Sequence, residues 1–225
     1  MTKVIKNSIP NTVTCLNLFS GCIACVMAFE AKYELALLFI ALSSIFDFFD
    51  GLLARALNAH SIIGKDLDSL ADDVSFGVAP AALMANTMLH YGSPEWTCLF
   101  ALFIPACGAI RLAKFNNDTE QAAVFRGLPI PANAIFWIGL YGWVTQYTYP
   151  GWAVMAILFA VISLAMTGNF KMFSLKFKNF DFAENFCRYV IILGAIGFIA
   201  LYGIAGLLWT ILLYFLLSIL RRKRL

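Results

Sequence analysis

Charged residues are scarce in this sequence. Asp, Glu, Lys and Arg make up only 13% of its 225 residues, against about 25% in an ordinary soluble domain. Hydrophobic residues make up 61% of the chain, and the mean hydropathy is +0.81. This composition excludes a soluble globular fold and indicates an integral membrane protein. Several spans of about 20 residues fit into this length with little room for a separate soluble domain, so we expect a single domain over residues 1–225.

The sequence also lacks the residue patterns of disulfide frameworks and zinc sites. Its six cysteines are scattered through apolar segments, and its two histidines stand alone. We expect the cysteines to be small buried side chains, because the Cys22–Cys25 pair has no polar context for redox chemistry. The first apolar run lacks a small-residue cleavage site, so we expect it to remain as the first span rather than to be removed as a leader.

Apolar runs divide the chain into about eight expected spans. They cover approximately residues 12–30, 34–57, 67–90, 96–115, 130–147, 151–168, 186–203 and 206–220. The breaks between them contain Gly, Pro, Asn and charged residues. The breaks at 30–34 and 203–206 are the least marked, since a tight turn containing glycine is easily hidden inside one apolar run. The predicted fold is therefore an all-α, polytopic helical bundle.

The cations are distributed unevenly over these spans. If the N-terminus is cytoplasmic, every Lys and Arg except Lys32 lies on or near the cytoplasmic side. This bias indicates an even number of spans, with both termini in the cytoplasm. Four phenylalanines at 170, 173, 177 and 180 recur at helical spacing between lysines, and this pattern predicts an amphipathic helix in the cytoplasmic interface.

Four aspartates interrupt the apolar sequence between residues 47 and 72. Asp47 and Asp50 lie near the cytoplasmic end of one span, and Asp68 and Asp72 lie near the start of the next. Their spacings of three and four residues place each pair on one helix face. An ionisable group at membrane depth costs about 2.5–3.5 kcal/mol. Like charges about 4 Å apart repel by a further 4 kcal/mol or so at an effective dielectric near 20, so something specific must offset this cost.

Two interpretations of the aspartates follow from their spacing. Converging carboxylates suit a hard divalent cation, Mg²⁺, Mn²⁺ or Ca²⁺, or they form the proton relay or salt bridges of an ion-coupled transporter. The neighbouring residues favour the metal. Gly51 and Ala54 would let a ligand approach the helix backbone, and Arg55 is a cation able to clamp a phosphate through two hydrogen bonds. Together these features indicate diphosphate chemistry, in which catalysis is mostly positioning and charge neutralisation.

The same residues resemble the signature of the CDP-alcohol phosphotransferases. The signature is matched without departure by Asp47-x2-Asp50-Gly51-x2-Ala54-Arg55-x8-Gly64-x3-Asp68-x3-Asp72. The resemblance implies a membrane-embedded, usually dimeric enzyme with a six-helix core, which displaces CMP from a CDP-linked lipid with an alcohol. It implies that the four aspartates hold one or two divalent ions and that Asp72 is also the general base. The implied contacts to the CDP-lipid are Pro10, Asn11, Thr12, Asp50, Gly51, Ala54, Arg55, Ser61 and Gly64.

Further motifs resemble the phosphatidylserine synthases of bacteria and archaea within that family. These motifs are LDSLAD at 67–72, SFGVAP at 75–80, FRGLPIPA at 125–132 and MTGNFK at 166–171. The likeness ends before the last two spans, at about 186–220. It implies an enzyme of the prokaryotic cytoplasmic membrane, with its active site on the cytoplasmic side, CDP-diacylglycerol and L-serine as substrates and no nucleic-acid partner. Glycerol 3-phosphate or inositol is the alternative acceptor.

Serine brings a carboxylate into the site, so the acceptor pocket should offer a cation. The candidates for binding this carboxylate, or a lipid phosphate, lie on the expected cytoplasmic side: Arg111, Lys114, Asn116 and Arg126.

Overall fold

Helices run through almost all of the computed structural model, which describes residues 3–59, 62–117, 125–173 and 181–221. In chain order the elements are α1 (Lys3–Phe29), α2 (Tyr33–Ala56), α3 (Ile62–Asp73), η1 (Val74–Val78), α4 (Ala79–His90), η2 (Glu95–Leu102), α5 (Phe103–Asn117), β1 (Phe125–Arg126), α6 (Ile130–Gln146), α7 (Trp152–Thr167), β2 (Lys171–Met172), α8 (Phe182–Tyr202), η3 (Gly203–Ala205) and α9 (Gly206–Arg221). Here η1 is a π-helical segment, and η2 and η3 are 3-10 helices. The all-α prediction is confirmed, with two short strands as an addition.

The eight predicted spans correspond to eight helical runs of the described residues. The third run joins α3, η1 and α4, and the fourth joins η2 and α5. By length and composition, four segments are able to cross a membrane: Ser8–Phe29, Tyr33–Ala56, Glu95–Asn117 and Asn185–Leu220, the last of which includes most of α8 and α9. Large apolar side chains such as Phe19 and Leu193 are exposed on these helices. The chain is therefore a multi-pass membrane protein.

The helix boundaries show one correction and two confirmations. Helix α1 begins at Lys3 rather than near residue 12, because the polar residues before the apolar run continue the helix, with Pro10 inside it. The breaks expected after the first and seventh spans are present, and both are tight turns. Ala31 adopts φ 57° between α1 and α2, and Gly203 adopts φ 56° between α8 and α9.

The segment around residue 170 differs from the amphipathic helix that the phenylalanine spacing predicted. Lys171 and Met172 form β2, which pairs antiparallel with β1 in the register Phe125↔Met172 and Arg126↔Lys171. Phe173 is buried against the core. The backbone hydrogen bonds of this two-stranded ribbon outweigh the helical periodicity there. Phe177 and Phe180 lie outside the described residues.

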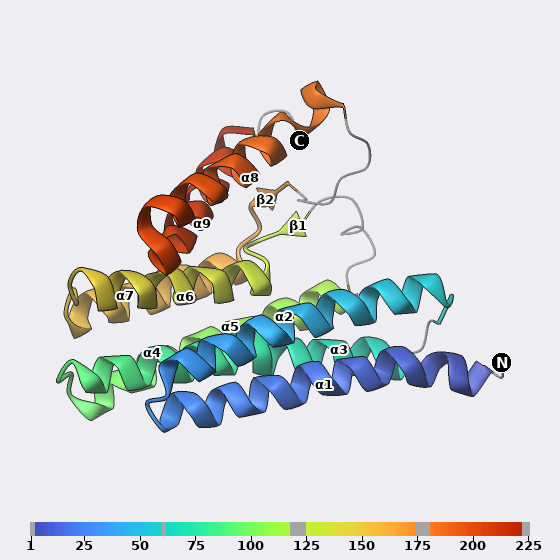
Figure 1. The fold of residues 1–225 in the computed structure, drawn as a ribbon, viewed down its shortest axis with the longest axis horizontal. Helices are drawn as coiled ribbons and strands as arrows, with labels where there is room; N and C mark the ends of the chain where they lie inside the picture. The colour runs from blue at the N-terminus through green and yellow to red at the C-terminus, as the bar shows by residue number, and fades with distance from the viewer. Residues whose placement is uncertain (1–2, 60–61, 118–124, 174–180, 222–225) are drawn as a thin grey trace.

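The helices pack around one buried core. Helix α1 runs along α2 and also contacts α3, η1 and α4, while α5 packs on α7 and α6 packs on α9. Figure 1 shows α8 and α9 as a hairpin that crosses the outer side of α6 and α7. The largest fully buried side chains include Trp137, Phe76 and Phe159. The ring of Trp137 stacks on that of Phe159 at a centroid distance of 4.7 Å, which ties α6 to α7.

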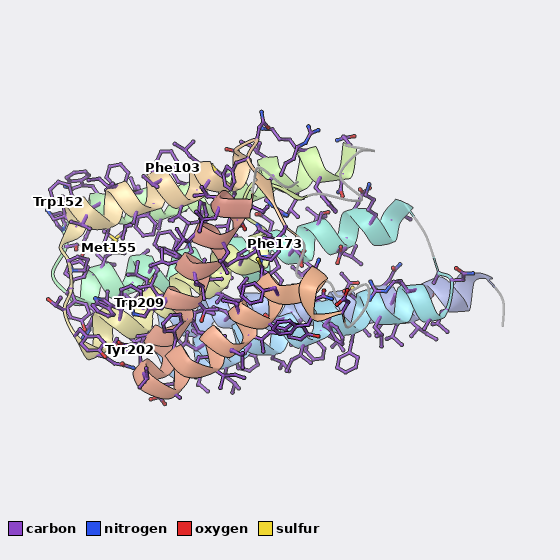
Figure 2. All side chains as sticks on the ribbon, turned by 90° about the horizontal axis from the view of Figure 1, so that it is seen from above. Phe103, Trp152, Met155, Phe173, Tyr202 and Trp209 are labelled. Carbon is purple, nitrogen blue, oxygen red and sulfur yellow. The ribbon has the colours of Figure 1, made fainter. Side chains whose placement is uncertain are left out.

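Aromatic side chains gather at one end of the bundle. Figure 2 shows Trp152, Tyr202 and Trp209 at the end away from the N-terminus of α1. The rings of Trp96 and Trp152 lie 5.4 Å apart, and those of Tyr202 and Trp209 lie 6.4 Å apart. Tryptophan and tyrosine are enriched where membrane meets water. The end of α2 that carries the aspartates lies at the opposite end of the bundle (Figure 1).

Candidate functional site

Three of the four predicted aspartates converge. Asp47 and Asp50 lie on the last turns of α2, Asp68 lies on α3, and one carboxylate oxygen of each falls within 4.8 Å of the others. Asp50 is buried, and the other two are half-buried. The antiparallel approach of the two helix faces therefore produces the carboxylate cluster that the spacing predicted.

The chemistry of this cluster fits a divalent cation. All the ligands that it offers are carboxylate oxygens, which suit hard ions. The Oδ2 atom of Asp50 is buried and has no hydrogen-bond partner among the described residues. An orphaned buried acceptor is costly in a folded protein, and a cation held between Asp47, Asp50 and Asp68 would satisfy it.

Asp72 stands apart from the other three aspartates. It is 9% exposed, lies one turn further along α3 than Asp68, and is near enough to the cluster for the carboxylate charges to repel one another. The Nδ2 group of Asn17 donates a hydrogen bond of 3.5 Å to Oδ1 of Asp72. Asp72 is therefore held by a protein side chain at the edge of the cluster, rather than within the group of converging oxygens.

Asn17 is a functional candidate that the sequence analysis did not identify. Its side chain is fully buried, and its Oδ1 atom accepts a 2.7 Å hydrogen bond from the Ser75 hydroxyl. Its backbone carbonyl accepts hydrogen bonds from both Ser43 and Ser75, each 3.1 Å long. The signal that would have found it is the row of small or polar residues that recurs along one buried face of α1: Pro10, Thr14, Asn17 and Gly21.

A close helix contact fixes this network. A Cβ atom on Gly21 would lie 2.3 Å from Oγ and 2.9 Å from Cα of Ser75, so only glycine lets α1 approach the π-helical η1 this closely. π-helical turns are rare and often lie at functional sites. This one follows directly on α3, which ends at Asp73, and brings Ser75 against α1.

An open cavity of about 1620 Å³ lies over the cluster, between α1, α2, α3 and α5. Most of the residues predicted to contact the CDP-lipid line it: Pro10, Asn11, Asp50, Gly51, Ala54, Arg55 and Gly64. A Cβ atom on Gly51 would meet only Arg55 Nη1, at 3.7 Å, so the backbone of α2 is open to a ligand here. Thr12 is not among the lining residues: it is exposed on α1, and its hydroxyl donates to the Ser8 carbonyl, 2.8 Å away. Ser61 lies outside the described residues.

The lining also includes residues that the sequence analysis did not select. Thr14 is the cavity-facing threonine of α1, and Oγ1 of this residue lies 3.1 Å from the Pro10 carbonyl. Lys65, Asp66 and Asn117 add charged and polar groups at the α3 and α5 side. They follow no signature spacing, and only the packing of α3 against α5 reveals them.

The four acceptor candidates occupy different places. Arg111 is buried near Asp72, and its Nε atom has no hydrogen-bond partner among the described residues. Asn116 lines the cavity, donates to Ser69 Oγ at 2.8 Å and accepts from Lys65 Nζ at 2.6 Å. Lys114 is exposed and donates to the Thr167 carbonyl at 3.3 Å, and Arg126 is exposed on β1. Of the four, Arg111 approaches Asp72 and Asn116 borders the cavity.

Fold and site together define a class: a multi-pass helical membrane protein that presents a carboxylate cluster and an arginine to one open cavity. Comparison with known proteins narrows this class. The sequence model of the CDP-alcohol phosphatidyltransferases matches residues 7–168, which cover α1 to α7 and all of the signature. The chain therefore belongs to the CDP-alcohol phosphatidyltransferase family.

Several curated relatives share this region. A CDP-diacylglycerol–serine O-phosphatidyltransferase of Mycobacterium leprae is 38% identical over 64% of this chain and 50% of its own length. The enzyme of that name from Bacillus subtilis is 42% identical over 56% of this chain and 70% of its own length. The one from Methanocaldococcus jannaschii is 33% identical over 82% of this chain and 84% of its own length. The chain thus spans about half the length of the mycobacterial relative and most of the archaeal one.

Proposed function

We propose that this protein transfers the phosphatidyl group of CDP-diacylglycerol to the hydroxyl of L-serine and releases CMP. The observation that carries the proposal is the convergence of Asp47, Asp50 and Asp68 beneath a cavity that also exposes Arg55 and the backbone of Gly51. The names of the relatives support serine as the acceptor.

The cavity offers suitable contacts for a nucleotide-diphosphate lipid. Arg55 reaches a diphosphate with a planar, permanently charged guanidinium. The open backbone at Gly51 allows a phosphate to approach α2 closely. Asp47, Asp50 and Asp68, with Asp72 in reach, would hold one or two divalent ions, and we propose Mg²⁺ or Mn²⁺, with Ca²⁺ as an ion that also fits. When bound, such an ion neutralises diphosphate charge and stabilises the departing CMP.

Asp72 is the proposed general base. In the reaction the serine oxygen forms a bond to the phosphorus that carries diacylglycerol, and the bond from that phosphorus to the oxygen of CMP breaks. The serine hydroxyl must lose its proton as this happens, and a carboxylate within hydrogen-bond reach is able to take it. The Asn17 amide supports this role because it orients one oxygen of Asp72 and leaves the other for the substrate.

Arg111 is the proposed partner of the serine carboxylate. It is a buried cation near Asp72 whose Nε donor has no partner in the part of the chain that the structure describes, and an arginine binds a carboxylate well through two hydrogen bonds. Lys114, Asn116 and Arg126 remain as further candidates for the serine carboxylate or for lipid phosphate.

We also propose that the protein is a homodimer with both termini and the site on the cytoplasmic side. The uneven distribution of Lys and Arg along the sequence supports this orientation.

Release of CMP tests the proposal. Purified protein in detergent or vesicles is given CDP-diacylglycerol, Mn²⁺ or Mg²⁺, and in turn L-serine, glycerol 3-phosphate and inositol. We expect CMP release only when L-serine is the alcohol, and none after chelation of the metal. The matched variant Asp50→Asn keeps the size of the side chain and should be inactive. Release with glycerol 3-phosphate or inositol in place of serine would overturn the assignment of the acceptor, and an absence of release with every alcohol would overturn the enzyme assignment.

A further inference from the structure

The C-terminal hairpin α8–α9 lies outside the family match, which ends at residue 168, yet it is seated on the core by direct backbone contact. A Cβ atom on Gly139 of α6 would lie 2.1 Å from the backbone nitrogen of Leu208, and one on Gly142 would lie 2.7 Å from that of Ala205. Such close approach of two backbones requires glycine. The hairpin is therefore fixed in position relative to α6, rather than appended to the membrane-facing surface.

One side chain of this hairpin connects it to the segment after α7. Tyr214 of α9 is 2% exposed, and its hydroxyl donates a 2.9 Å hydrogen bond to the backbone carbonyl of Phe173, directly after β2. The rings of Tyr214 and Phe173 meet edge to face at a centroid distance of 5.3 Å. The next residue of α9 is Phe215, and its ring centroid lies 5.4 Å from that of Phe170, just before β2. Helix α9 thus holds β2 from both ends.

The strand β2 in turn holds the segment that carries Arg126. Besides the β1–β2 pairing, the Gly127 amide donates to the Phe170 carbonyl at 2.9 Å, and the Leu128 amide donates to the Ala165 carbonyl at 3.0 Å. Gly127 adopts φ 72°, and a Cβ atom there would lie 2.3 Å from the Met166 carbonyl oxygen. The ribbon thus connects the hairpin α8–α9 to Arg126, one of the acceptor candidates.

Tyr214 also lies near Arg111, close enough for the two groups to interact electrostatically, and Arg111 interacts in the same way with Asp72.

We propose that Tyr214 is a positioning residue through which the hairpin α8–α9 fixes the β1–β2 ribbon and, with it, the acceptor candidate Arg126. It does not touch the reacting atoms. The expected kinetic effect rests on the proposed transfer reaction. The anchoring of the ribbon by Tyr214 does not depend on any activity.

The variant Tyr214→Phe removes one hydroxyl and keeps the ring contact with Phe173. Loss of one hydrogen bond corresponds to a roughly 2- to 13-fold effect, and we expect it in the KM for the acceptor alcohol, with kcat and the KM for CDP-diacylglycerol unchanged. The matched control is Thr210→Val. It removes a buried hydroxyl from the same helix, and among the described residues this hydroxyl bonds only to the Gly206 carbonyl. It should leave both KM values unchanged.

Amide hydrogen exchange gives a second readout that requires no turnover. In Tyr214→Phe we expect faster exchange at Gly127, whose amide donates to the Phe170 carbonyl next to β2, and in Thr210→Val we expect wild-type exchange there. Wild-type exchange in Tyr214→Phe, or equal changes in both variants, would overturn the inference even if the protein used an acceptor other than serine. If the wild type released no CMP with any alcohol, the proposed function would fail, and the exchange experiment would still decide whether Tyr214 anchors the ribbon.

Discussion

Replacing Asn17 by leucine removes the amide that donates to Asp72 while it keeps a buried side chain of similar size. The proposed base would then lose a hydrogen bond that favours its charged form and fixes its orientation. The Ser75 hydroxyl would lose one acceptor, but it retains the backbone carbonyl of residue 17 at 3.1 Å. The variant therefore changes Asp72 without leaving a buried hydroxyl unpaired.

The size of the effect follows from the geometry. Hydrogen bonds to charged groups contribute about 1.5–3 kcal/mol, and a bond of 3.5 Å lies at the long limit for this interaction. The lower end of that range, about 1.5 kcal/mol, corresponds to a loss of roughly tenfold. Because Asn17 does not line the cavity, we expect the loss in kcat, with the KM for CDP-diacylglycerol unchanged.

Steady-state CMP release at saturating and limiting CDP-diacylglycerol separates these two constants. The control is Ser43→Ala, which removes a buried hydroxyl that donates to the same Asn17 carbonyl but does not contact Asp72. Its kcat should stay near that of the wild type. A wild-type kcat in Asn17→Leu, or an equal fall in Ser43→Ala, would refute the idea that Asn17 acts through Asp72.

Other variants test separate parts of the site. Asp72→Asn should abolish turnover while CDP-diacylglycerol still binds in a direct binding assay, whereas Asp47→Asn should shift the metal concentration needed for activity upward; retained turnover in Asp72→Asn would remove the general-base proposal. Arg55→Lys should raise the KM for CDP-diacylglycerol about tenfold, because lysine loses the second hydrogen bond to phosphate; an unchanged KM would argue against the clamp. Gly139→Ala should lower the melting temperature, since overpacking costs about 1–3 kcal/mol and its Cβ atom would meet Leu208. The control is Gly197→Ala, which has open space around it and should not lower the melting temperature.

Much of the site could be predicted because it depends on local periodicity. The spacing of Asp47 and Asp50 put both carboxylates on one face of a helix, and a short connection brought Asp68 opposite them. The spans were predictable for the same reason, since a run of apolar residues fixes a membrane helix whatever its neighbours are.

The remaining features depend on contacts between distant segments. Spacing alone grouped Asp72 with the other carboxylates, but the structure holds it against Asn17 of α1. The helical spacing of Phe170 and Phe173 gave a wrong prediction because strand β1, far away in the sequence, offers backbone partners. Likewise, nothing near Arg111 in the sequence indicates that it lies close to Tyr214. Packing between helices determines which of these residues meet, and the periodicity within one helix does not predict it.

The π-helical segment η1 has a consequence for how this site tolerates insertions and deletions. It joins two helices with different requirements: α3 must turn Asp68 toward α2, while α4 must bury Leu83, Met84 and Met88. The wider π-helical turn between them changes the direction in which the following side chains point. The inward face of α4 therefore need not continue the inward face of α3. A π-helical turn holds one residue more than an α-helical turn, so deleting one residue within Val74–Val78 would let the segment close as an ordinary α-helical turn. The inward faces of α3 and α4 would then keep their relative orientation, and Asp68 would stay in the cluster.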